Sequence, residues 1–259
     1  MAFLVMLAVG LLFRNNPLLG LQRVKKKDLP LFIAGGIFQP CLYYLVETYT
    51  YQQLSSPTVA EALMSTSPLL APIFAAVFLR EKVTLNQILG IVVSSAGMLL
   101  LILAGSESFD IGHPIGVLLA FVAVCVAIMY SVMIRRIPAH YNSMTVVFYT
   151  QGMALLFFYP LWAIFDLPTM SWQFGAELGH SLLAAGYLAV FATVGGFIMF
   201  CYTLRQLGLT RANIFNNIRP LFTALFMMFI YSEQLPLVKW VGMVLVIIGL
   251  FVCQRQTHN

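Results

Sequence analysis

The sequence predicts an all-α membrane protein built from two inverted-topology repeats. Three observations lead to this fold class. Of the 259 residues, 61% are hydrophobic and only 9% are charged. Eight apolar stretches are each long enough to cross a bilayer. Two parts of the chain match when one is shifted by 152 residues. Each repeat nominally has five helices, and the first repeat lacks its first helix, which leaves about nine helices with the first one clipped.

The composition excludes several classes of protein. A soluble domain is about 45–50% apolar and about 25% charged, and the apolar excess here cannot be hidden in one globular core. A cytosolic enzyme, a disordered protein and a nucleic-acid binder are therefore excluded. The net charge of +5 comes from basic residues placed between apolar stretches, a pattern that sets orientation in a lipid bilayer and does not indicate nucleic acid.

The elements are expected in a regular order along the chain. The eight stretches cover 31–53, 57–79, 84–104, 114–134, 143–165, 181–203, 210–231 and 236–253. A ninth, 1–13, is too short to cross alone and is expected to be the second part of a helix whose start is absent. Pro57, Pro114 and Pro236 lie at or near helix starts. Thr84 and Gln87 form a capping box that opens the third stretch.

The basic residues predict the orientation of the spans. Twelve of the fourteen lie in alternate loops or in the end segments, all on one side of the predicted membrane. The opposite loops hold only Lys239, and Arg219 lies inside a span. The positive-inside rule places the twelve in the cytoplasm. We therefore expect a cytoplasmic tail at 254–259 and a periplasmic loop at 106–112.

The internal match predicts a first repeat over 1–104 and a second over 114–253. The shift of 152 superposes Pro68 on Pro220, Glu81 on Glu233, Gly90 on Gly242 and Gly97 on Gly249. The charges at the matched turns differ, since Arg80 and Lys82 correspond to Ser232 and Gln234. An odd number of spans per repeat requires this inversion, which is typical of secondary transporters. The alternative is a fortuitous alignment of apolar helices.

The first span of the second repeat has no counterpart in the first. Its start near Pro114 corresponds to a position about 38 residues before Met1. We therefore expect one whole helix to be missing, through either a wrong start codon or a genuine truncation.

The doubled motif also resembles a known family. From Leu69 to Leu100 the chain shows a Pro-containing helix, a Phe-Leu-x-Glu turn, then Thr-x-x-Gln-x-x-Gly and a second Gly seven residues on. The segment from Glu233 to Gly249 repeats part of this pattern. The chain resembles the EamA-type transporters of the drug/metabolite transporter superfamily. The resemblance implies ten helices, cytoplasmic termini and efflux of amino acids, metabolites or drugs across a bacterial inner membrane.

Charged side chains inside spans are costly, so Glu47, Glu61 and Arg219 are functional candidates. Arg219 is expected near the midplane, where it needs an anion, backbone carbonyls or water. The helical period places Asn213, Asn216, Asn217 and Pro220 on one face, and Glu61, Ser65, Pro68 and Pro72 on the matching face. The two faces are predicted to enclose a wet cavity. The alternatives are packing hydrogen bonds between helices and, for Glu47, contact with the outer headgroups.

Other prominent residues have mainly structural interpretations. Glu81 and Glu233 are expected to act as turn or capping residues. Gly90, Ser94 and Gly97 are expected to let helices approach closely. Tyr130 and Tyr202 are candidates for stacking on a substrate. A further six tyrosines and tryptophans lie mostly near span ends, which is typical of the membrane interface: Tyr43, Tyr44, Tyr49, Tyr51, Trp162 and Trp172.

The sequence therefore predicts a secondary transporter that exports a small-molecule substrate by alternating access. No GxxxxGK[ST] motif is present, so transport would use an ion gradient or none, and Glu61 is the candidate for proton coupling. The cysteines have no metal-ligand spacing and indicate packing: Cys41, Cys125, Cys201 and Cys253. We expect no metal, no cofactor and no enzymatic activity, and nothing indicates an oligomeric state.

The sequence leaves two other functions open. An intramembrane enzyme needs a nucleophile with a partner base, but the four histidines lie in loops, near span ends or in the tail. A truncated, non-transporting membrane protein is the stronger alternative, because the resemblance to EamA-type transporters implies that the missing helix contributes to the central cavity.

Overall fold

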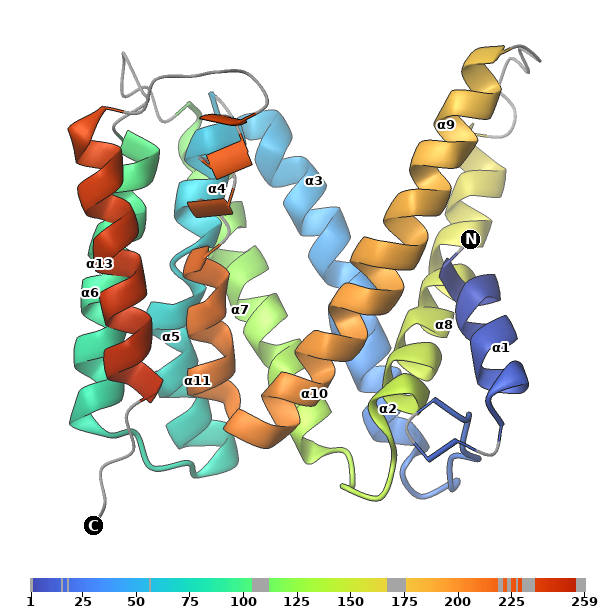
Figure 1. Cartoon of the computed structure of the whole chain (residues 1–259). Helices are drawn as coiled ribbons and strands as arrows, with labels where there is room; N and C mark the ends of the chain where they lie inside the picture. Colours follow the sequence, from blue (N-terminus) through green and yellow to red (C-terminus); the bar gives the residue numbers. More distant parts are fainter. Residues whose placement is uncertain are drawn as a thin grey trace. The chain divides into compact units, whose positions relative to one another are not determined.

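The computed structural model is helical nearly throughout the part that it describes (Figure 1). It describes residues 2–14, 16, 17, 19–55, 57–103, 112–166, 176–218, 221, 222, 225, 226, 228, 229 and 236–254. Apart from helices and turns, these residues contain one isolated bridge, between Leu54 and Gly112. The predicted all-α membrane class is confirmed.

The chain divides into two compact units, Met1–Leu42 with Met133–Gln206 and Tyr43–Val132 with Leu207–Asn259. The first unit contains α1 (Ala2–Leu12), α2 (Leu29–Gly36), η1 (Ile37–Leu42), α8 (Ser143–Leu161), η3 (Trp162–Asp166), α9 (Ala176–Tyr187), η5 (Leu188–Gly196) and, as far as Gln206, α10 (Phe197–Leu207). The second contains α3 (Tyr43–Gln53), α4 (Pro57–Met64), α5 (Ser67–Phe74), η2 (Ala75–Leu79), α6 (Leu85–Leu103), α11 (Leu209–Asn213), η6 (Ile214–Ile218) and α13 (Leu237–Gln254). Helix α7 (Pro114–Arg136) belongs to the second unit as far as Val132.

Five helical segments of the described chain are long and apolar enough to cross a membrane: Leu29–Gln53, Pro114–Arg136, Ser143–Ile164, Leu183–Leu207 and Leu237–Gln254. Ala2–Leu12, Ser67–Leu79 and Leu85–Leu101 are shorter apolar helices. Together they account for the predicted stretches except 210–231, part of which lies outside the described residues. The chain is a multi-pass membrane protein.

Two predicted spans are interrupted, and a proline lies close to each interruption. The predicted stretch 31–53 leaves helical geometry at Gln39 (φ −145°, ψ 124°), because the residue before Pro40 is sterically pushed out of the α region. The predicted stretch 57–79 divides at a turn before Ser67, where α5 begins with a proline in its first turn. Proline is tolerated there because its missing N–H would have no helical partner.

The third span begins as predicted. The Thr84 backbone N–H donates to Gln87 Oε1 over 2.9 Å, and the Gln87 N–H donates to Thr84 Oγ1 over 3.4 Å. This reciprocal pair is a capping box, which satisfies two backbone donors at the start of α6.

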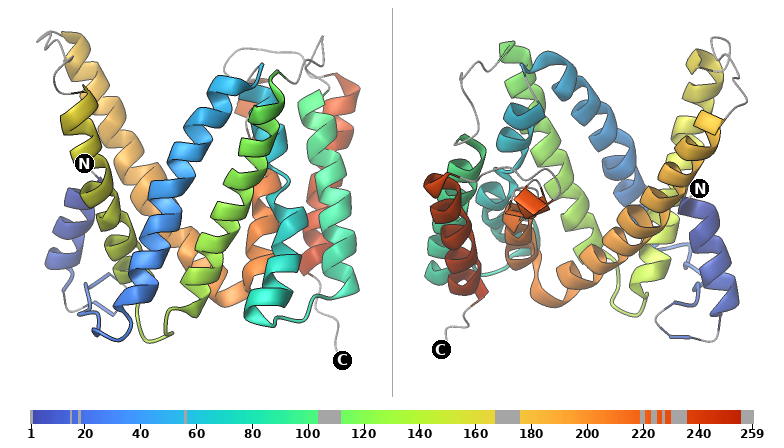
Figure 2. Two further views of the ribbon diagram at one scale, coloured as in Figure 1. Left: turned by 180° about the vertical axis from the view of Figure 1, so that it is seen from behind. Right: turned by 45° about the horizontal axis from the view of Figure 1, so that its top comes forward.

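Helices α6 and α13 lie side by side in the second unit (Figure 2). A Cβ added to Gly90 would lie 2.5 Å from the Gly249 carbonyl oxygen, and one added to Gly97 would lie 2.6 Å from that of Gly242. Only glycine allows two helix backbones to approach so closely. The core around them consists of Ile91, Met98, Leu101, Ile214, Met243, Val246, Leu250 and Cys253.

The first unit is braced by polar contacts between the segment that precedes α2 and the turn that precedes α8. The Tyr141 hydroxyl donates to Asp28 Oδ2 over 2.9 Å and accepts from the Lys25 N–H over 3.0 Å. The Asn142 N–H donates to Gln22 Oε1 over 2.8 Å. The Arg205 guanidinium donates to the backbone carbonyls of Tyr141 and Pro138. These contacts hold both segments in defined positions.

Candidate functional site

The candidate site is a cluster of amides and hydroxyls in the second unit, and it is built around α11 and η6. Gly208 starts α11 with φ +85°, a conformation that favours glycine. The α-helical hydrogen bonding changes to the tighter 3₁₀ pattern at Ile214–Ile218. Of the three asparagines that the sequence singled out, Asn213 ends the α-helical part, and Asn216 and Asn217 lie in the 3₁₀ part.

Glu81 holds the first turn of α11. Arg80 ends η2 in the left-handed conformation (φ 54°), and the Glu81 carboxylate follows it. Glu81 Oε2 accepts a hydrogen bond from the Leu209 N–H over 3.2 Å. A Cβ on Gly208 would lie 3.2 Å from the same oxygen, so the glycine also makes room for the carboxylate. The expected capping role of Glu81 is confirmed.

Asn217 is the most deeply buried of the three asparagines, with 0% of its surface exposed. Its Nδ2 donates to Ser94 Oγ over 3.0 Å and to Ser95 Oγ over 3.3 Å. Its Oδ1 is buried and accepts no hydrogen bond from any residue that the structure describes. A buried amide oxygen in this state is costly unless a donor reaches it.

Asn213 and Asn216 extend the cluster toward α5. Asn213 is 3% exposed, and its Nδ2 donates to the Leu209 carbonyl over 2.9 Å. Asn216 Nδ2 donates to Ser67 Oγ over 3.3 Å and lies 3.4 Å from Asn213 Oδ1. The structure therefore brings together the two polar segments that the sequence matched, through the Asn216–Ser67 contact. Ser65 lies buried in the turn between α4 and α5.

The two span carboxylates are each bound by a tyrosine. The Tyr43 hydroxyl donates to Glu47 Oε1 over 2.7 Å within α3. The Tyr51 hydroxyl donates to Glu61 Oε1 over 2.5 Å and so joins α3 to α4. Glu61 is an exposed residue and Glu47 is half-buried. Sequence reasoning assigned both tyrosines to the membrane interface and missed their bonds to the carboxylates.

The remaining candidates lie in different surroundings. Tyr130 on α7 is buried, with 1% of its surface exposed. Tyr202 on α10 belongs to the first unit and is 56% exposed. Arg219 lies outside the described residues, as do Pro220 and Glu233.

The hydrogen bonds of Asn217 to Ser94 and Ser95 were not predicted from the sequence. Ser95 was not a candidate, and Ser94 was assigned only to close helix packing. The signal was present as two adjacent hydroxyls in the apolar middle of the span, four and five residues after Gly90. Gly90 and Gly97 let α13 approach α6 closely, and the serines between them meet Asn217. The close approach of α13 and the hydrogen bonds to Asn217 therefore involve neighbouring residues of α6.

The described part of the chain is thus a multi-pass helical membrane protein with a buried cluster of neutral polar groups in its second unit. The model of the EamA-like transporter family matches residues 1–103 and 114–254, so the chain belongs to the EamA-like transporter family. The predicted family resemblance is confirmed.

Named relatives agree with this assignment. The chain is 27% identical over 235 residues to an uncharacterized transporter of Archaeoglobus fulgidus, covering 91% of this chain and 81% of the relative. It is 26% identical over 258 residues to a probable terminal-alkyne amino-acid exporter of Streptantibioticus cattleyicolor, covering 98% and 82%. A solved crystal structure shares the fold at TM-score 0.74 and 20% identity, covering 97% of this chain and 85% of that one.

Proposed function

We propose that this membrane transporter is a secondary exporter of small metabolites, amino acids or drugs that works by alternating access. Its setting would be a bacterial inner membrane, with the C-terminus in the cytoplasm. Family membership supports the general class, and the relative named an amino-acid exporter supports the direction and a polar, small-molecule substrate. The distribution of basic residues supports the orientation.

The observation that carries the substrate site is the buried Asn217 Oδ1. An amide oxygen there needs a donor, and an ammonium, amide or hydroxyl group of a substrate would supply one. Asn213, Asn216 and Ser67 add neutral polar groups nearby. We place the substrate's polar head at this cluster, with Ser65 at its edge. Neutral hydrogen-bonding groups suit a zwitterion or an uncharged polar metabolite better than a highly charged one.

The paired glycines support the proposal of two inverted repeats over 1–104 and 114–253, with a tail at 254–259. Gly90 meets Gly249 and Gly97 meets Gly242. Under the 152-residue shift, the first pair becomes the second pair with its members exchanged. A pseudo-two-fold relation between repeats produces this exchange.

In this proposal Arg219 binds the carboxylate of the substrate. Glu61 carries the proton that couples transport to an ion gradient. The rival role for Arg219 is a fixed ion pair with Glu61. The substrate role predicts that Arg219→Gln folds but loses transport of anionic substrates. The ion pair predicts low expression for Arg219→Gln and for Glu61→Gln, and recovery in the double variant. Glu47, Tyr130 and Tyr202 stay secondary candidates.

The function is tested with deletion and overexpression strains exposed to amino acids, their toxic analogues and drugs. An exporter raises resistance to its substrates on overexpression and lowers it on deletion, and cells preloaded with the labelled compound release it faster. Stable membrane expression with no change in resistance or release for any compound would instead support the non-transporting alternative.

A further inference from the structure

We infer that the segment joining α1 to α2 forms a binding site for an anionic phospholipid, with Arg14 holding the phosphate and the outer face of α1 holding an acyl chain. The inference is independent of the transport site, because every residue in it belongs to the first unit.

Helix α1 has one packed face and one open face. Phe3 stacks on Phe148 of α8 with ring centroids 4.6 Å apart, and Met6 is fully buried. Leu4 and Leu11 lie on the other side, 66% and 62% exposed. They are seven residues apart, which is two helical turns, so they form one apolar strip along the helix. In a membrane protein such a strip faces acyl chains.

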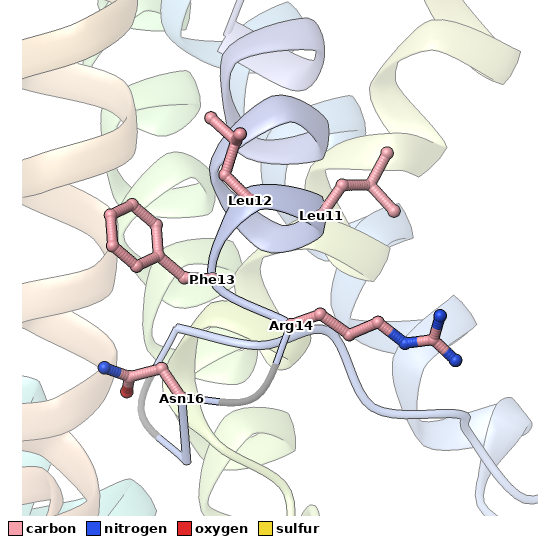
Figure 3. Close-up of a pocket in the computed structure, with 5 residues that line it drawn as sticks. All are labelled: Leu11, Leu12, Phe13, Arg14 and Asn16. Atoms are coloured by element: carbon pink, nitrogen blue, oxygen red, sulfur yellow. The ribbon is translucent and has the colours of Figure 1, made fainter.

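The strip ends at a cation. Arg14 follows Leu11 by three residues, and both side chains extend to the same side of the chain in Figure 3. These two residues help to line a hollow at the end of α1, together with Leu12, Phe13 and Asn16. A hollow lined by leucine side chains and by a guanidinium offers groups that match both parts of an anionic phospholipid, the acyl chain and the phosphate.

Four further cations lie in the same connecting segment: Arg23, Lys25, Lys26 and Lys27. All four are exposed. Asp28 is the acidic residue of this segment, and its carboxylate is buried and accepts from the Tyr141 hydroxyl. One carboxylate against five basic residues, Arg14 included, leaves the segment with a net positive charge. An uncompensated basic cluster next to a membrane helix attracts anionic headgroups by about 1 kcal/mol per basic residue.

The segment is held in place before any lipid binds. The Gln22 N–H donates to Thr145 Oγ1 over 3.0 Å, and Asn142 Nδ2 donates to the Gly20 carbonyl over 2.7 Å and to the Pro17 carbonyl over 3.1 Å. Backbone groups, one amide and one hydroxyl make these contacts, and none of them uses a basic side chain. A fixed backbone lowers the entropic cost of binding.

The test measures phosphatidylglycerol binding to the purified full chain in detergent, by native mass spectrometry over a titration. Phosphatidylcholine is the neutral reference lipid, and glycerol phosphate is the soluble competitor. We expect phosphatidylglycerol to bind more tightly than phosphatidylcholine. Arg14→Gln should weaken phosphatidylglycerol binding about fivefold, whereas Arg14→Lys should retain most of it. Lys82→Gln removes one exposed cation from the second unit and should change binding little.

Three results would overturn the inference. Equal losses in Arg14→Gln and Lys82→Gln would show a general charge effect. Equal binding of the two lipids would show that the strip holds acyl chains without recognising the headgroup. Complete competition by glycerol phosphate would show a soluble-anion site. Arg14 is exposed, so its replacement leaves the packing of α1 intact.

Discussion

Glu81 Oε2 lies 3.2 Å from the Leu209 backbone nitrogen, so a carboxylate from the turn after η2 caps a helix that begins 128 positions later. Under the repeat shift of 152 residues Glu81 corresponds to Glu233, whereas Leu209 corresponds to Pro57. Proline has no N–H. The same hydrogen bond therefore cannot form at the matching position, and the two predicted repeats differ in how the polar helix starts.

Removing this cap should destabilise the second unit. Glu81→Ala loses the acceptor for the Leu209 N–H, at a cost of about 1–2 kcal/mol. Glu81→Gln keeps an acceptor oxygen and should cost less. Thermal unfolding in detergent measures both, with Lys82→Ala as the matched control because Lys82 is an exposed neighbour. Equal melting temperatures for Glu81→Ala and Lys82→Ala would contradict the capping role.

The glycine contact between α6 and α13 should tolerate no side chain. In Gly90→Ala the new methyl would lie 2.5 Å from the Gly249 carbonyl, so the helices must separate, at a cost of about 1–3 kcal/mol. Gly186 is also helical, but no atom lies within 4 Å of an added Cβ. Gly186→Ala should therefore raise stability by up to about 1 kcal/mol. Thermal melts of the two variants should move in opposite directions, and equal shifts would refute the contact.

The sequence predicts the helix starts and the close contacts best. Thr84 and Gln87 lie at the spacing that a capping box requires, so local chemistry alone identifies them. The glycines are also identifiable, because small residues recur at matched positions of both predicted repeats.

Tertiary partners are harder to predict. Periodicity placed Asn217 on a polar face but contained no information on α6, so Ser95 was missed as its partner. The position of Tyr51 near a span end was explained by the membrane interface alone. Its hydrogen bond to Glu61 depends on how α3 and α4 pack together, which the sequence pattern does not give. The break at 65–66 was missed because an apolar stretch of spanning length predicts one continuous helix.

Tyr141→Phe should loosen the first unit. The hydroxyl bonds both Asp28 and the Lys25 N–H, so its removal leaves a buried carboxylate short of a donor and lowers the melting temperature at neutral pH. Tyr159→Phe, at a ring that is 65% exposed, is the control. Identical melts for the two variants would contradict the bracing role.

The same variant predicts a pH dependence. Burial, with the bond to Asp28, raises the pKa of the Tyr141 hydroxyl. The folded state therefore favours the protonated phenol, and this contribution is complete below the usual tyrosine pKa of about 10. It is lost as pH rises through the higher folded value. The difference in melting temperature between wild type and Tyr141→Phe should shrink above that pH, and a difference that widens would be inconsistent.

The orientation is checked with reporter fusions. A reporter that is active only in the cytoplasm should work after Asn259, and one that is active only in the periplasm should work within 106–112. The uneven distribution of basic residues is the reason for this expectation. Activity of the periplasmic reporter after Asn259 would reverse the topology.

The measurement closest to the central claim is export per folded molecule by Asn217 variants, using a substrate found in the resistance panel. If Asn217 Oδ1 accepts a hydrogen bond from the substrate, Asn217→Ala should lower export at least tenfold at equal membrane levels. Asn217→Asp keeps an acceptor and should retain more activity. Ser94→Ala removes a partner of Nδ2 only, so it should affect folding stability more than export. Wild-type export by the folded Asn217→Ala protein would contradict the account.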